Sequence, residues 1–298
     1  MKLVTYGPVG AELPGVLVNE EVVPLLPALT EAGLQGLPAN AMLALWPALR
    51  EVVQSALQRG RARYPIVTVR LGAPVLNPGK IIGVGLNYRG YVSQVFDPNS
   101  LPVDPVLFLK PASSLCGAFD AIVTPPESAD VEPELEIAVV IGKAGHRVPV
   151  ARAMDHVFGF MAANDVTARD VFIGESAKSP LFLQAARGKG FIGFCPTGPW
   201  LLTRDEVTDL SAFELNLTVN GYVRQSGRSD SMICDIPSLV AAASCAFGLM
   251  PGDILLTGSP PRQRRTDGGP TSLKAGDEVR ALISLLGEMV NPIARETQ

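Results

Sequence analysis

The stretch Pro133-Glu134-Leu135-Glu136-Ile137-Ala138-Val139-Val140-Ile141-Gly142-Lys143 indicates a buried strand that opens on two acids. Residues Ile137 to Ile141 are apolar and mostly β-branched, which is typical of a strand in the core of a sheet. Side chains two residues apart on a strand point to one face, so Glu134 and Glu136 are expected to lie side by side. Two carboxylates held close repel each other, and a divalent cation would remove that conflict. Such oxygen ligands suit Mg²⁺, Mn²⁺ or Ca²⁺ rather than Zn²⁺. The alternative is a solvated strand end with two surface acids, and Glu-x-Glu by itself is compatible with both.

The composition is that of a folded globular protein. The chain has 298 residues, 47% of them hydrophobic and 18% charged, so it can bury a large core and disorder is not expected. The net charge is −4 and no basic run stands out, which argues against nucleic acid as a partner. No apolar run reaches the ~18 residues of a membrane span, and we find no signal segment. The four cysteines have no CxxC spacing, as in reduced proteins. We therefore expect a cytoplasmic protein without a membrane or nucleic-acid partner.

The order of patterns along the chain predicts two parts, a small N-terminal domain over residues 1–72 and a larger domain over residues 73–298. A proline-rich junction at 73–79 separates them. Strand patterns occupy Lys2 to Tyr6, Gly15 to Asn19, Ile66 to Leu71 and Lys80 to Gly85, and helical patterns occupy Ala41 to Gln58 and Ile236 to Leu249. The turn-rich segment 88–104 is a candidate lid. With 26 prolines and 29 glycines, short strands and turns are favoured over a helical bundle.

Several segments taken together resemble the fumarylacetoacetate hydrolase family. They are Ile82-Gly83-Val84-Gly85-Leu86-Asn87-Tyr88, Phe108-Leu109-Lys110-Pro111, Glu134 to Lys143, Ala163-Asn164-Asp165-Val166-Thr167-Ala168-Arg169-Asp170, Arg187-Gly188-Lys189-Gly190-Phe191, Phe194 to Trp200, and Pro251-Gly252-Asp253 through Thr257-Gly258-Ser259-Pro260. Each segment is weak evidence alone, but together, in this order, they span about Lys80 to Pro292.

The resemblance implies an α+β, β-rich fold in which a rolled mixed β-sheet domain follows a small N-terminal domain, often as a homodimer. It also implies a divalent metal, Mg²⁺ or alternatively Mn²⁺ or Ca²⁺, held by three carboxylates that fall on Glu134, Glu136 and Asp165. A small acidic substrate such as a 2-oxo acid or β-diketo acid could chelate the open positions, and the metal would then stabilise an enolate as a Lewis acid.

Six further residues in these segments are candidates for roles beside the metal. Lys189 matches the family's site lysine and is the candidate catalytic cation, the alternative being a surface lysine in a Gly-rich loop. Lys110 either reaches the substrate or forms a structural salt bridge. Thr257 is a candidate substrate-binding hydroxyl, and Arg187 either attracts an acidic substrate or is solvated. Arg169 and Asp170 are expected to form a structural pair beside the metal loop.

The chain departs from the family on the lid. Hydrolytic and decarboxylating members commonly carry His and Glu three residues apart, where this chain has Tyr91 and Gln94. Tyrosine, with an ordinary pKa of about 10, is a poor base, and glutamine is not a base. We expect the two histidines, His146 and His156, to be structural. After Pro260, Arg262, Arg264 and Arg265 replace a small Gly-rich turn; a solvated loop is favoured over a grip on an acidic substrate.

These departures leave three hypotheses for the function. The first is a metal-dependent hydrolase of a C–C bond in a small diketo or 2-oxo acid. The second is a tautomerase, isomerase or decarboxylase of an oxo acid, which needs only enolate stabilisation and proton transfer, with Tyr91 as the proton donor. The third is a non-catalytic protein that binds metal and ligand, although the three acids and Lys189 speak against it. The family resemblance places hydrolysis first.

Overall fold

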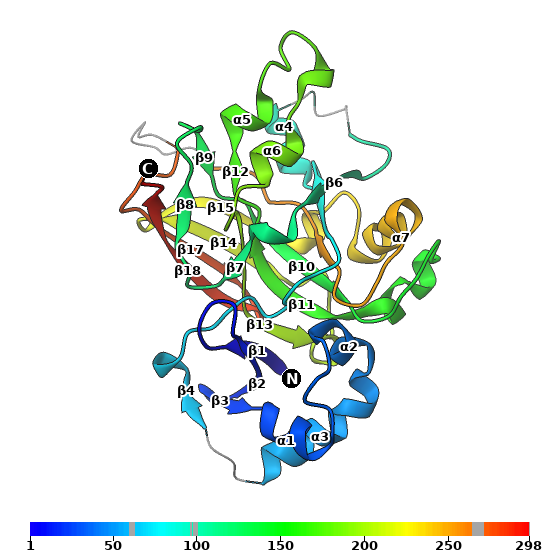
Figure 1. Cartoon of the computed structure of the whole chain (residues 1–298). Helices are drawn as coiled ribbons and strands as arrows, with labels where there is room; N and C mark the ends of the chain where they lie inside the picture. The colour runs from blue at the N-terminus through cyan, green and yellow to red at the C-terminus, as the bar shows by residue number, and fades with distance from the viewer. Residues whose placement is uncertain (60–62, 96, 98–100, 264–270, 298) are drawn as a thin grey trace.

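A long mixed sheet runs through the whole molecule (Figure 1). The computed structural model describes residues 1–59, 63–95, 97, 101–263 and 271–297. The strands of this sheet, in spatial order, are β4 (Tyr64–Pro65), β3 (Glu21–Pro24), β2 (Leu13–Val18), β1 (Lys2–Tyr6), β13 (Cys195–Thr203), β11 (Val157–Asn164), β10 (Leu135–Ile141), β16 (Ile254–Leu256), β5 (Ile81–Gly85) and β6 (Val106–Lys110), with β7 (Leu115–Gly117) paired to β13. The β16–β5 and β13–β7 pairs are parallel and the others antiparallel, so the sheet is mixed as predicted.

A second sheet covers one side of the first. Its strands, in spatial order, are β15 (Tyr222–Arg228), β14 (Glu214–Val219), β17 (Glu278–Ile283), β18 (Gly287–Arg295) and β8 (Ile122–Thr124). Buried and exposed residues alternate along β17, as expected of a sheet with one face on the core. The main core contains residues from both sheets, and Phe160 of β11 packs there against Phe213, directly before β14, with ring centroids 5.8 Å apart. The predicted β-rich α+β fold with a rolled mixed sheet is therefore confirmed.

Strand β10 lies in the middle of this core, and its seven residues are all buried. Ile137 and Val139 belong to the core between the sheets, whereas Ala138 and Val140 face the smaller cluster on the other side. A strand buried on both faces has no polar alternation, which explains the continuous apolar pattern in the sequence. Only the beginning of the strand can carry polar side chains toward a site.

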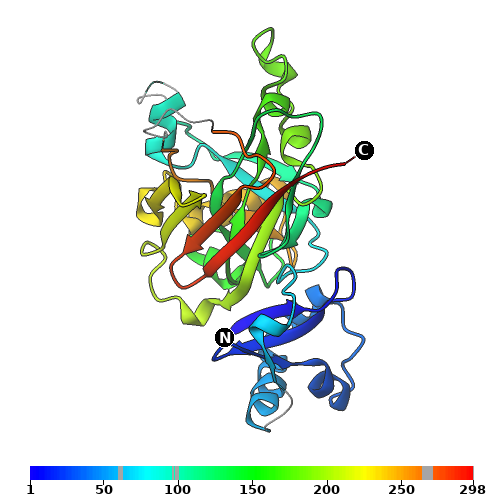
Figure 2. The same ribbon diagram turned by 90° about the vertical axis from the view of Figure 1, so that its left-hand side faces the viewer.

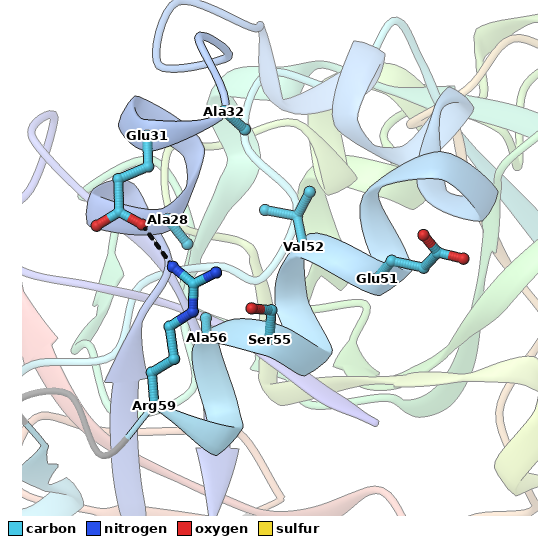
Figure 3. A pocket seen from close by; sticks show the side chains of 8 residues that line it. All are labelled: Ala28, Glu31, Ala32, Glu51, Val52, Ser55, Ala56 and Arg59. Carbon is cyan, nitrogen blue, oxygen red and sulfur yellow. Dashed lines mark hydrogen bonds and ion pairs between the residues drawn. The ribbon is translucent and has the colours of Figure 1, made fainter.

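The helices lie at the two ends of the molecule and along one side (Figures 1 and 2). They are α1 (Leu26–Glu31), α2 (Ala39–Ala44), α3 (Trp46–Gln58), α4 (Arg89–Val95), α5 (Arg169–Ile173), α6 (Ala185–Lys189) and α7 (Ile236–Phe247). Helices α1 and α3 face each other across a groove of about 450 Å³, closed at one side by the ion pair of Arg59 and Glu31 at 3.0 Å (Figure 3). Helices α4, α5 and α6 gather at the end opposite to the N-terminal elements, beside the two-stranded ribbon of β9 (Val131–Glu132) and β12 (Thr167–Ala168).

The N-terminal strands continue the long sheet because β1 pairs with β13, with Lys2 opposite Leu202. The boundary predicted at residue 72 stays a prediction. Two local predictions differ from the structure. The predicted strand from Ile66 to Leu71 begins instead as a 3₁₀ turn over Ile66–Thr68, with Val67 90% exposed, and its end pairs with β1 through the bridge of Leu71 with Tyr6. The predicted helix from Ala41 to Gln58 is divided at Leu45, and Pro47 lies in the first turn of α3, where a missing N–H costs nothing.

Candidate metal centre

The register of two strands brings the three predicted metal ligands together. Strands β10 and β11 pair antiparallel with Leu135 opposite Asn164. The pairing continues one residue further, because the Asp165 N–H donates to the Glu134 carbonyl at 2.8 Å. The Asn164 amide oxygen also accepts from the Glu134 N–H at 2.8 Å. Asp165 therefore lies directly across from Glu134.

The carboxylates of Glu134, Glu136 and Asp165 form one buried cluster. One oxygen from each lies within 4.8 Å of the others, and the residues are only 7%, 2% and 1% exposed. Lys189, at the end of α6, inserts its ammonium among them, 2.7 Å from Glu134 Oε2 and 2.5 Å from Asp165 Oδ2. It also donates to the Thr167 hydroxyl at 2.8 Å. The alternative of a surface lysine is therefore wrong for Lys189, although its catalytic role stays a prediction.

The charges in this cluster are unevenly compensated. Burial would raise the pKa of Glu134, but Lys189 and Arg262 outweigh it and lower that pKa. At Glu136, burial and then Asp165 raise the pKa well above its ordinary value. Burial opposes the charge of Lys189 as well, yet Asp165 and Glu134 raise its pKa and keep the amine protonated. Glu136 accepts from the Gly258 N–H at 2.7 Å but forms no salt bridge with any described residue.

These observations fit a divalent cation bound by the three acids. The ligand atoms are hard oxygens, as Mg²⁺, Mn²⁺ and Ca²⁺ prefer. Two acidic side chains on one strand face and a third on the neighbouring strand converge on one point. The cation would neutralise the buried charge of Glu136, which Lys189 leaves only partly compensated.

The other predicted binding residues are placed differently. Lys110 is buried behind the acids, with its ammonium 2.7 Å from Asp165 Oδ1 and donating to the Lys189 carbonyl. Thr257 is fully buried, and its hydroxyl has no hydrogen-bond partner among the described residues. Arg187 is exposed on α6. The residues that line the cavity at the acids do not include these three, so their substrate-binding roles remain predictions.

The cavity in front of the acids holds about 490 Å³ and is lined by both charged and apolar side chains. The charged residues of the lining are the three acids with Lys189, Arg169 and Arg262, and Tyr91 and Thr167 also line the cavity. The apolar residues of the lining include Val84, Val106, Phe108, Phe172 and Leu183. A concave, largely apolar pocket with a few converging charged groups is the usual form of a small-molecule site.

The segment predicted as a lid, residues 88–104, begins with helix α4, which carries Tyr91 and Gln94; residues 96 and 98–100 lie outside the described residues, and the role of a lid stays a prediction. Tyr91 lines the cavity, and burial, followed by the negative charge of Glu134, raises the pKa of its phenol. The phenol therefore stays protonated at neutral pH and is a donor rather than a base. Gln94 is bound to the chain at Arg262: its Nε2 donates to the Arg262 carbonyl at 2.8 Å, and its Oε1 accepts from the Arg262 N–H at 3.1 Å.

The prediction of a solvated loop at Arg262 is wrong. Its side chain is 21% exposed and forms ion pairs with Glu132 and, at 2.5 Å, with Glu134 Oε1, so a solvated loop is incorrect at this position. Arg264 and Arg265 lie outside the described residues. The expected pair of Arg169 and Asp170 is also wrong, because Arg169 approaches Glu132 at 3.8 Å. Asp170 instead accepts hydrogen bonds from Ser128 and Ala129.

Neither histidine lines the cavity at the acids. His146 is exposed, and His156 makes its ring contact with the Lys143 carbonyl at 3.0 Å. The absence of a histidine base beside the acids agrees with what Tyr91 and Gln94 imply on the lid.

Residues 80–294 match the family description "Fumarylacetoacetate (FAA) hydrolase C-terminal". The chain belongs to the fumarylacetoacetate hydrolase family. The family resemblance drawn from the sequence motifs is thereby confirmed, and so is the fold that it implied.

Relatives within the fumarylacetoacetate hydrolase family carry several enzyme names. The chain is 40% identical over 242 residues, 81% of its length and 75% of the other, to the mitochondrial oxaloacetate tautomerase FAHD2A of Bos taurus. A probable 2-hydroxyhepta-2,4-diene-1,7-dioate isomerase from Mycobacterium abscessus is 35% identical with a TM-score of 0.81, and maleylpyruvate hydrolase from Sphingobium sp. SYK-6, in complex with manganese(II) and pyruvate, is 30% identical with a TM-score of 0.80. Each of these two matches covers 100% of this chain and 100% of the other protein's chain. Hydrolases, isomerases and tautomerases thus share this fold, and one contains a divalent metal.

Across the described part of the chain, every helix is too short or too polar to span a lipid bilayer.

Proposed function

We propose that this protein is a metal-dependent tautomerase of a small dicarboxylic 2-oxo acid. The observation that carries the proposal is the pairing of a three-carboxylate cluster with helix α4, Arg89–Val95, which carries the phenol of Tyr91 and no His, Asp or Glu. The tautomerase among the relatives supports it, as does the dicarboxylic nature of the compounds named for the tautomerase and the isomerase.

The buried acids and Lys189 would bind and polarise the substrate. A divalent cation held by Glu134, Glu136 and Asp165 would act as a Lewis acid and stabilise an enolate. Lys189 stays an ammonium, because three hydrogen bonds, to Glu134, Asp165 and Thr167, fix it, and it offsets negative charge that develops on substrate oxygen. The apolar residues of the lining, Phe108 among them, would keep water from the reacting carbons and strengthen these electrostatic interactions.

Tyr91 would move the proton. Its phenol would donate its proton to the carbon next to the 2-oxo group when the enol form becomes the keto form. The enol hydroxyl would lose its own proton to the resulting phenolate, directly or through water, so that Tyr91 ends as the neutral phenol. Because a tautomerisation consumes no proton overall, a weak acid that returns to its starting state is sufficient. The raised pKa of Tyr91 is compatible with this role and incompatible with activation of water.

Hydrolysis of a C–C bond is the second candidate. The likeness to a maleylpyruvate hydrolase, at 30% identity over the whole chain, favours it. Hydrolysis requires a group that removes a proton from water, and Gln94 cannot do so. Metal-bound water or one of the acids would have to take that part.

One experiment separates the two candidates. The protein, loaded with Mn²⁺, is mixed in D₂O with the enol form of oxaloacetate and, separately, with maleylpyruvate, and the products are followed by NMR. Faster ketonisation with deuterium at C3 supports tautomerisation, whereas release of maleate and pyruvate from maleylpyruvate supports hydrolysis. Pyruvate formed from oxaloacetate would indicate decarboxylation. A protein treated with EDTA is the control, and equal rates with and without metal would refute a metal-dependent reaction.

The homodimer stays a prediction, which sedimentation velocity would test.

A further inference from the structure

The backbone at Arg262 is fixed from two sides. On one side, the side-chain amide of Gln94 both donates to and accepts from the Arg262 main chain. On the other, Arg262 forms an isolated antiparallel bridge with Gln225 on β15, whose side chain also binds the Pro260 carbonyl at 3.0 Å. The lid helix and the second sheet therefore share this one residue.

The guanidinium of Arg262 is directed into the cavity and is incompletely used. It pairs with Glu132 and Glu134, and it lies 5.6 Å from the centre of the Tyr91 ring. Its Nε–H is buried and has no hydrogen-bond partner among the described residues. Arg262 contacts one carboxylate oxygen of Glu134, and Lys189 contacts the other. A metal ion bound by Glu134 would therefore compete with Arg262 for that carboxylate. Among the described residues, Arg262 is therefore a cation at the cavity whose Nε–H has no partner and which shares the carboxylate of Glu134 with Lys189.

The charges around the cavity suggest what Arg262 would bind. Among the described residues, the acids of this cluster are Glu132, Glu134, Glu136 and Asp165, and the cations that contact them are Lys110, Lys189, Arg169 and Arg262. When all of these groups are ionised, the charges of the four acids and the four cations sum to zero. A divalent cation would then leave two positive charges, which a substrate with two carboxylates would neutralise.

We propose that Arg262 binds the second carboxylate of the substrate, the one that does not chelate the metal, and that Gln94 is a positioning residue that presents Arg262 to it. This assignment rests on the proposed function. A guanidinium forms paired hydrogen bonds with a carboxylate in a fixed plane, and a fixed backbone reduces the freedom lost when the ligand binds. Glutamine suits this position because its amide both donates and accepts, whereas a glutamate would set a negative charge against the Arg262 carbonyl.

The test compares two ligands that differ only at the far end. 2-Oxoglutarate and 2-oxopentanoate share the 2-oxo acid group, but only the first has a second carboxylate. Their dissociation constants are measured by calorimetry with the Mn²⁺-loaded protein. Mn²⁺ binding itself is measured first, with no ligand present. The variants are Arg262→Met and Gln94→Ala. Arg228→Met is the matched control, because Arg228 also pairs with two acids, Glu214 and Asp230, but is 49% exposed and does not line the cavity.

We expect Arg262→Met to raise the Kd of 2-oxoglutarate by about 10-fold or more and the Kd of 2-oxopentanoate by less than about 3-fold. Loss of a hydrogen bond between charged groups predicts a difference of this size. Gln94→Ala should reduce the preference for 2-oxoglutarate over 2-oxopentanoate and leave the Mn²⁺ affinity unchanged. A general loss of folding would lower the Mn²⁺ affinity as well. Arg228→Met should change neither constant. Equal weakening of the binding of both ligands by Arg262→Met would overturn the assignment and leave the proposed function intact. A wild-type protein without a preference for 2-oxoglutarate would overturn the assignment and also count against a dicarboxylic substrate. A wild-type protein that does not bind Mn²⁺ would refute the proposed function and this inference together.

Discussion

Replacing Lys189 by Met removes the buried cation and keeps a side chain of similar length. The Lys189 side chain is 7% exposed, and its ammonium contacts Glu134, Asp165 and Thr167 at 2.5–2.8 Å. Methionine can fill the space beside Phe108, whose ring centre is 5.1 Å from the ammonium. The substitution therefore changes charge far more than packing.

The expected cost is large because the acids stay buried. Breaking a buried ion pair by removal of one partner typically costs about 3–5 kcal/mol, since the remaining charge is uncompensated. Lys110 still contacts Asp165 and Arg262 still contacts Glu134, so we expect about 3 kcal/mol, the lower end of that range. A divalent cation in the acid cluster should recover part of this loss, by about 2.7 kcal/mol at a concentration 100 times its Kd.

The assay is equilibrium unfolding in urea of wild type and Lys189→Met, each in EDTA and in Mn²⁺. The free energy of unfolding in EDTA should fall by about 3 kcal/mol, and Mn²⁺ should stabilise both proteins. Lys178→Met is the matched control, because its pair with Glu175 is 68% and 64% exposed and surface pairs contribute at most about 1 kcal/mol. Equal losses for the two lysines in EDTA would refute the view that Lys189 compensates the buried acids.

Three further outcomes can be measured. Asp165→Ala should abolish Mn²⁺ binding in calorimetry, because it removes one of three ligands, and an unchanged Kd would contradict the metal site. Mn²⁺ affinity should rise with pH, because burial and Asp165 raise the pKa of Glu136 and the metal must displace the proton that Glu136 keeps. For one displaced proton, the association constant rises by up to about tenfold per pH unit. An Mn²⁺ affinity that does not change with pH would exclude this competition. Tyr91→Phe should lower kcat for ketonisation by about 100-fold with little change in KM, because the proton donor is lost, and full kcat would show that Tyr91 only packs against Arg262.

The sequence by itself determined the central strand and the shared direction of two acids. The run from Ile137 to Ile141 is apolar without alternation, and β10 is buried on both faces as that pattern predicts. Glu134 and Glu136 converge because side chains on a strand repeat every two residues. Asp165 came instead from the family resemblance, and the structural reason for its place is the register of β10 with β11.

Only the tertiary structure decided which distant charges meet. Gln94 was visible in the sequence as a departure from the family, but its partner Arg262 is 168 residues away. The same holds for the pairs of Arg262 with Glu132 and Glu134. It holds as well for the error at Ile66 to Leu71, where the chain turns over Ile66–Thr68 before Leu71 meets Tyr6 of β1. Periodicity is a local property of the backbone and is readable from neighbouring residues. Contacts between charges depend on which strands and loops become neighbours when the core forms, and no local pattern encodes that choice.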